Sequence, residues 1–166
     1  MKKIFKWAAL ILLFVFIVIQ FFRPAKNRSD AANPNAIQNK YPIPTEVAKI
    51  LEVACNDCHS NNTRYPWYAE IQPVGWWLKG HIDDGKRGLN FDDYLSYPIR
   101  KQYKRMDDVV NLVKKDAMPL NSYLWIHKDA KLDAKQKEVL FAWANGIRDS
   151  IKANYPADSL VRKTQP

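Results

Sequence analysis

Cysteine and glycine are both scarce in this sequence. Only two of the 166 residues are cysteine, and both lie in one pentapeptide, so a network of disulfide bonds does not hold the fold together. Five glycines are too few for a β-rich fold with many tight turns. No nucleic-acid-binding motif and no basic stripe is evident. The formal net charge of +9 therefore does not indicate a nucleic-acid partner.

Aromatic and charged residues, in contrast, are abundant. Six Trp contribute to an aromatic content of 13%, which suits either an ordinary core or a small domain that wraps a large apolar cofactor. A composition of 47% hydrophobic and 26% charged residues excludes a disordered chain. Basic and acidic residues are interleaved, as in residues 135–138. This pattern predicts a solvated surface with a docking face for an acidic partner.

A hydrophobic segment opens the chain. Residues 4–22 form a run that is about 28 Å long as a helix, close to the ~30 Å hydrocarbon core of a membrane. A cleaved signal peptide needs small residues soon after the apolar run, but Phe22 is followed by Arg23 and Pro24. We therefore expect residues 1–22 to be an uncleaved membrane anchor. Basic residues flank the run on both sides, so they do not settle its orientation.

The composition divides the remaining chain into three parts. Residues 23–43 are rich in Asn, Ala, Pro and Lys and predict a flexible linker. Residues 44–152 show apolar residues at helical spacing and no persuasive strand, which predicts an all-α domain. Residues 153–166 are expected to form a polar tail. The expected helices cover 45–54, 74–84, 98–117 and 134–151, with shorter helical turns at 91–95 and 122–126.

The pentapeptide CNDCH at 55–59 matches the C-x-x-C-H signature of c-type haem attachment. Two thiols that add across the two vinyl groups of one haem must lie on one helical turn, and the adjacent His then lies beneath the iron. A thioredoxin-like site normally opens a helix after a strand, and a zinc site needs further closely spaced ligands. The motif therefore predicts one covalent haem c per chain, bound through Cys55 and Cys58, with His59 as an iron ligand.

Several residues are candidates for the iron ligand on the second face of the haem. Met118 is favoured because it precedes Pro119 in a loop between two expected helices, and a thioether opposite His suits electron transfer. Met106 lies in a helical apolar stripe and is expected in the core. His81 and His127 are more typical of a core residue and a loop residue. An empty sixth position remains a further alternative.

The order of these features resembles known haem proteins. A helix before CNDCH, a later Met118 and a final helix bearing Trp143 resemble a monohaem class I cytochrome c, whose first and last helices cross at such an aromatic residue. A closer resemblance is to the haem-binding domain family of Bacteroidetes-type bacteria. The stretches that carry it are CNDCHSNNTRYPWY (55–68), PVGWWLKGHID (73–83), LNF (89–91) and MPLNSY (118–123), with Trp143.

The resemblance has consequences for location and function. It implies haem attachment outside the cytoplasmic membrane, so we expect a single-pass anchor in the inner membrane, an inside N-terminus and a periplasmic domain. The favoured function is an electron carrier between redox partner proteins of the membrane and periplasm, rather than an enzyme. Alternatives are a peroxidase-like enzyme assisted by His81 or Arg64, and a diatomic-gas sensor. The Trp-rich segment 67–77, unlike small cytochromes, would wall the haem or form a partner surface.

Overall fold

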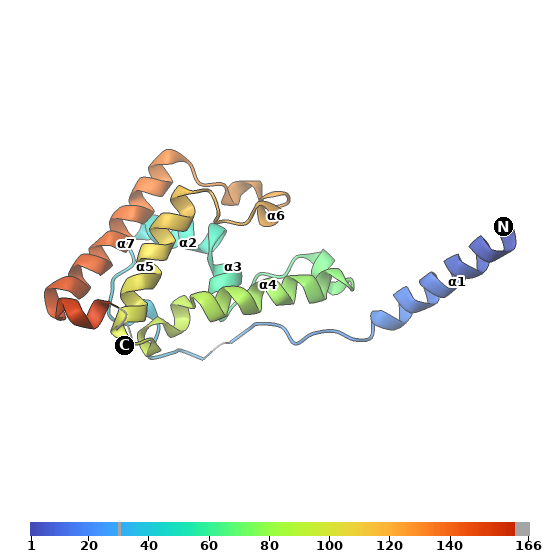
Figure 1. The fold of residues 1–166 in the computed structure, drawn as a ribbon, viewed down its shortest axis with the longest axis horizontal. Helices are drawn as coiled ribbons and strands as arrows, with labels where there is room; N and C mark the ends of the chain where they lie inside the picture. The colour runs from blue at the N-terminus through green and yellow to red at the C-terminus, as the bar shows by residue number, and fades with distance from the viewer. Residues whose placement is uncertain (30, 162–166) are drawn as a thin grey trace, which may run out of the picture.

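The computed structural model describes residues 1–29 and 31–161. Over these residues the chain is 68% helical and contains no strand, which confirms the predicted all-α class. Figure 1 shows α5 and α7 side by side, α4 extending away from them, and α1 projecting beyond the far end of α4. The long helices are α1 (Lys2–Ile19), α2 (Thr45–Ala54), α4 (Val74–Gly88), α5 (Ile99–Lys114) and α7 (Ala134–Asn154).

Shorter helical elements connect these long helices. Two are α-helical turns, and the others are 3-10 helices. They are η1 (Ile37–Asn39), α3 (Asn56–His59), η2 (Trp67–Glu70), η3 (Phe91–Ser96), α6 (Asn121–Leu124), η4 (Lys128–Ala130) and η5 (Ala157–Leu160). The helices predicted from apolar spacing are all present; α2 has the predicted ends, and one or both ends of the others differ by a few residues.

The core lies where α2 and α5 pack against α7. Met106 of α5 and Leu140 of α7 are fully buried, so Met106 is a core residue, as predicted. Asp133 caps α7 by accepting a hydrogen bond from the Gln136 amide (2.8 Å), which satisfies a backbone donor that the helix itself cannot pair. Trp143 is buried and donates from Nε1 to the Pro42 carbonyl (3.1 Å). This bond ties α7 to the chain that leads into α2.

The described part of the segment 23–43, which is residues 23–29 and 31–43, packs against the domain, whereas its composition predicts a flexible linker. Ile37 and Tyr41 are buried in the core. The Asn27 amide donates to the Tyr65 hydroxyl (2.7 Å), and the Leu95 amide donates to a carbonyl of the segment (2.8 Å). Two apolar side chains and these specific hydrogen bonds hold the segment in place, although its average composition is polar. Part of the predicted polar tail also packs against the core, through Leu160 of η5.

Helix α1 is solvent-exposed along its length and buries no residue. Its side chains, including Trp7 and Phe14, are mostly large and apolar. Long-range hydrogen bonds near its end join Gln20, the residue after the helix, to the loop before α4. Within residues 1–29 and 31–161, no helix combines the length and the apolar character that crossing a membrane requires.

Candidate functional site

A cavity of about 400 Å³ lies between α4, α5 and the junction of α2 and α3. Its volume falls in the roughly 300–1,000 Å³ range of small-molecule and cofactor sites. The loop after α5 and helix α6 complete the wall. The lining is mainly apolar and includes Leu89, Phe91, Val109, Leu112 and Val113. Such a wall suits a large, flat and mostly apolar ligand.

The cavity brings together the residues singled out from the sequence. Cys55, Cys58 and His59 line it on one side, and Met118 lines it from the loop after α5. His81 of α4 also lines it. Met118 lies 59 positions beyond the end of the CNDCH motif in the chain, so only the packing of α5 against the rest of the domain places it at this cavity.

Two other candidates lie elsewhere. His127 does not line the cavity; its ring stacks on Tyr123 with 4.1 Å between centroids. Arg64, considered as an assisting residue for peroxidase chemistry, is also absent from the lining and donates to Asp57 and to the Glu52 carbonyl (2.8 Å). Neither residue is placed to assist chemistry in the cavity.

The CNDCH motif forms a compact turn at the end of α2. The amides of Cys58 and His59 both donate to the Cys55 carbonyl, at 3.1 and 3.0 Å. These bonds bring both thiols and the imidazole to the same cavity. Helix α4 approaches this turn closely at Gly85, where an added Cβ would lie 2.5 Å from the Cys58 carbonyl oxygen. Glycine is required there because any side chain would collide with the backbone of the motif.

The imidazole of His59 is oriented by the backbone. Its Nδ1 lies 2.8 Å from the Leu89 carbonyl oxygen, and because a carbonyl only accepts, Nδ1 carries the proton. Burial lowers the pKa of His59 below its ordinary value, so the ring is neutral and Nε2 keeps its lone pair. A neutral imidazole whose other nitrogen donates to a carbonyl is the usual form of a metal-ligating histidine.

The two thiols are protonated in this environment. Burial raises the pKa of Cys55 to about 12 and that of Cys58 to about 11. A thioredoxin-like cysteine needs the opposite shift, toward a stable thiolate. In the described part of the chain, no group of three or more His, Cys, Asp and Glu side chains is arranged to hold a metal ion, so a zinc site lacks a ligand set there.

A buried carboxylate lies within the motif itself, and the sequence reasoning did not assign it a role. Asp57 is buried and accepts hydrogen bonds from the Tyr123 hydroxyl (2.7 Å) and from the Arg64 amide (3.0 Å) and Nε (3.2 Å). The Asp57 hydrogen bond raises the pKa of Arg64. The pKa of Tyr123 is raised mainly by burial and, to a smaller extent, by the neighbouring Asp57 carboxylate. Because Tyr123 lies in α6, soon after Met118, this cluster ties the Met118 loop to the CNDCH turn.

A family model for a haem-binding domain matches residues 14–146. The chain belongs to the haem-binding domain family. No curated protein and no solved structure matches it. The protein is therefore a haem-binding protein with an all-α fold, and the predicted membership of the haem-binding domain family is confirmed.

The cavity fits haem. Its apolar wall suits the macrocycle, and His59 offers an unprotonated Nε2 to iron. Arg105 lines the same cavity, and its Nε is buried without a hydrogen-bond partner among the described residues. A guanidinium donor left free in this way suits the carboxylate of a haem propionate.

The Trp-rich segment 67–77 does not wall this cavity. Helix α4 contributes residues to the lining only from His81 onward. Trp77 reaches the site indirectly, because its ring packs edge-on against His81 with 4.3 Å between centroids. Trp67 and Trp77 are both exposed. Of the two roles expected for this segment, a haem wall is contradicted and a surface role remains.

Proposed function

We propose that this protein is a membrane-attached, monohaem c-type cytochrome that transfers electrons. Cys55 and Cys58 would hold the haem through thioether bonds, and His59 and Met118 would ligate the iron. The observation that carries the proposal is the shared cavity: these four residues, separated by up to 63 positions in the chain, line one apolar space of about 400 Å³.

The bound haem would supply one-electron redox chemistry at its iron. The chain's own residues do the rest. The Leu89 carbonyl orients His59 (2.8 Å), and the apolar lining surrounds the space that the macrocycle would fill. A thioether opposite imidazole favours the reduced state and raises the reduction potential.

Location follows from the same proposal. Haem is attached to a C-x-x-C-H motif outside the cytoplasmic membrane, so the proposed function implies a periplasmic domain. We propose that the stretch 4–22, which leaves out Lys2 and Lys3 of α1 and continues three residues past its end at Ile19, holds the chain in the inner membrane, with the N-terminus inside. Support comes from α1, whose large apolar side chains are exposed to solvent and none of whose residues is buried. The partners of the protein would be redox proteins of the membrane or periplasm.

A second candidate function rests on His81. This side chain lines the same cavity and could serve an open sixth position, as in a peroxidase-like enzyme or a sensor of a diatomic gas. The alternative requires that Met118 does not ligate the iron, so that the sixth coordination position stays open. The two functions therefore differ at one residue.

Absorption spectra of purified holoprotein and of two variants test the choice. We expect Met118→Ala to lose the Met-ligated low-spin spectrum, lower the reduction potential and bind exogenous ligand, whereas His81→Ala retains the wild-type spectrum. An unchanged spectrum in Met118→Ala would contradict the Met118 assignment. Extraction of haem with acidified acetone tests attachment separately: haem stays with the wild-type protein and is released from a Cys55→Ala/Cys58→Ala variant.

A further inference from the structure

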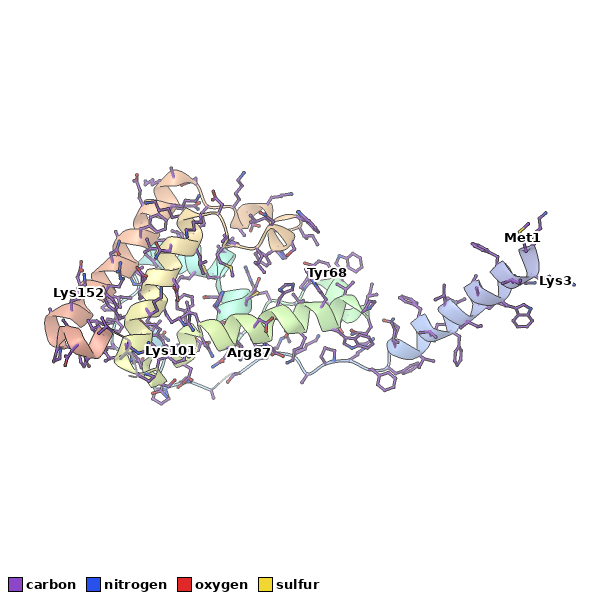
Figure 2. The ribbon with its side chains drawn as sticks, in the orientation of Figure 1. Met1, Lys3, Tyr68, Arg87, Lys101 and Lys152 are labelled. Atoms are coloured by element: carbon purple, nitrogen blue, oxygen red, sulfur yellow. The ribbon has the colours of Figure 1, made fainter. Side chains whose placement is uncertain are left out.

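An apolar patch covers η2 and the start of α4. We call the exposed side chains of Trp67, Ile71, Val74, Trp76 and Trp77 the interface patch. Their exposed fractions are 76%, 37%, 38%, 40% and 53%. In Figure 2, Tyr68 marks this end of α4, the end that faces α1. Single exposed apolar residues are ordinary, but five of them within one short stretch mark an interaction surface.

The interface patch is bonded to the end of the hydrophobic α1. Gln20 and Gln72 form a reciprocal pair, in which the Gln20 Nε2 donates to the Gln72 carbonyl (3.1 Å) and the Gln72 amide donates to the Gln20 Oε1 (2.9 Å). Trp76 donates from Nε1 to the Phe22 carbonyl (2.6 Å). The patch therefore lies at the point where the apolar run of α1 ends.

Basic residues follow immediately at the same place. Arg23, Lys26 and Arg28 come after the apolar run. Arg23 and Lys26 both pair with Glu70 of η2, and Lys26 holds the pKa of Glu70 below its ordinary value. Three cations face one carboxylate, so the rim of the patch has an excess of positive charge. Exposed Trp beside Lys and Arg is the composition found where proteins meet lipid headgroups.

We propose that the interface patch lies in the headgroup layer of the bilayer that holds α1. The inference rests on the proposed membrane attachment and goes beyond it: the haem domain is seated against an anionic lipid surface and does not swing freely on residues 23–43. The packing of that segment on the domain, through Asn27, Ile37 and Tyr41, agrees with a seated domain.

The proposed contact between the interface patch and the headgroups would fix the height of the haem cavity above the membrane. Along α4, His81 lies seven residues beyond Val74, or about 10 Å, and Gly88 lies about 21 Å beyond it. Both line the cavity. A membrane-bound electron donor would then meet the cavity at a nearly constant height, without a search by a tethered domain.

The test uses the full-length holoprotein with 5-fluorotryptophan, in nanodiscs of mixed neutral and anionic phospholipid. Fluorine NMR spectra are recorded with and without a lipid that carries a nitroxide at its headgroup, and single Trp→Phe variants assign the resonances. We expect the resonances of Trp67, Trp76 and Trp77 to broaden. Trp125 is the matched control, because it is 73% exposed and lies after α6. Its resonance should stay sharp.

A further tryptophan, Trp7, distinguishes failure of this inference from failure of the proposed membrane attachment. Trp7, in α1, reports on insertion of that helix alone. If the nitroxide lipid broadens the Trp7 resonance but not those of the patch residues, the placement of the interface patch in the headgroup layer is contradicted, and the proposed membrane attachment through α1 stands. Sharp resonances at every position overturn both. Equal broadening of Trp125 and the patch residues would instead indicate non-specific adsorption of the domain to lipid. In detergent micelles, patch resonances that change only with protein concentration would indicate that a second copy of the chain covers the patch. Either result contradicts the proposed contact with headgroups.

Discussion

Removal of one hydroxyl should weaken the connection between the Met118 loop and the CNDCH turn. In Tyr123→Phe, the 2.7 Å hydrogen bond from the phenol to Asp57 is lost while the ring is kept. The phenol is a reliable donor, because burial and the neighbouring carboxylate raise its pKa. Asp57 keeps its bonds from Arg64, so the carboxylate is not left without partners.

The magnitude follows from the kind of bond. A hydrogen bond to a charged group contributes about 1.5–3 kcal/mol, and we expect the free energy of unfolding to fall by that amount. For a chain of this size, a loss of 1 kcal/mol lowers Tm by about 2–4 °C, so Tm should fall by roughly 3–12 °C. Because Tyr123 holds the loop that carries Met118, the low-spin spectrum expected from the proposed Met118 ligation should also disappear at a lower urea concentration.

Tyr155→Phe is the matched control for this measurement. The Tyr155 hydroxyl accepts from Lys40 at 3.3 Å on the exposed surface, where such a bond contributes about 0–1 kcal/mol. Thermal and urea unfolding of both holoprotein variants, at equal haem content, give the comparison. If Tyr123→Phe were no less stable than Tyr155→Phe, the reasoning that Asp57 and Tyr123 clamp the loop would be refuted.

Two further predictions concern α4 and α7. Gly85→Ala should destabilise the holoprotein by about 1–3 kcal/mol and reduce haem incorporation, because its Cβ would lie 2.5 Å from the Cys58 carbonyl oxygen. Gly80→Ala, where the added Cβ meets nothing within 4 Å, should instead be neutral or stabilising by up to about 1 kcal/mol, and equal thermal stability of the two variants would contradict the close approach. The Lys137 hydrogen bond holds the pKa of Asp116 below its ordinary 3.8, so this pair adds stability above that pH and loses it as the pH falls through the folded-state pKa. Lys137→Met should raise the pKa of Asp116 toward 3.8 in an NMR titration, and an unchanged pKa would show that the pair has no effect in solution.

Local features of the sequence predicted the helices well. The span predicted for α2 matches the observed helix, and α7 begins at residue 134 as predicted, directly after its cap Asp133. Both depend on residues a few positions apart, since helical periodicity and capping are short-range effects. The CNDCH motif predicted the haem family for the same reason, because all its chemistry lies within five consecutive residues.

Segments whose place depends on distant partners were harder to predict. The polar average of residues 23–43 predicts a flexible linker, yet Ile37 and Tyr41 fill the core. The role of segment 67–77 could not be chosen from its Trp content, because exposed and buried aromatic residues have the same sequence signature. Only the direction of α4 relative to the cavity excludes these tryptophans from the haem wall.

The sequence by itself determined the helical class and the CNDCH turn, and it singled out Met118 as a candidate ligand, since each depends on neighbouring residues. Tertiary structure decided what surrounds them: the Leu89 carbonyl that orients His59, the close approach of Gly85, and the bond between Asp57 and Tyr123. These partners lie 27 to 66 positions from the motif residues they contact. No local pattern records such pairings, because they arise only when the packing of α4 and α5 encloses a single cavity.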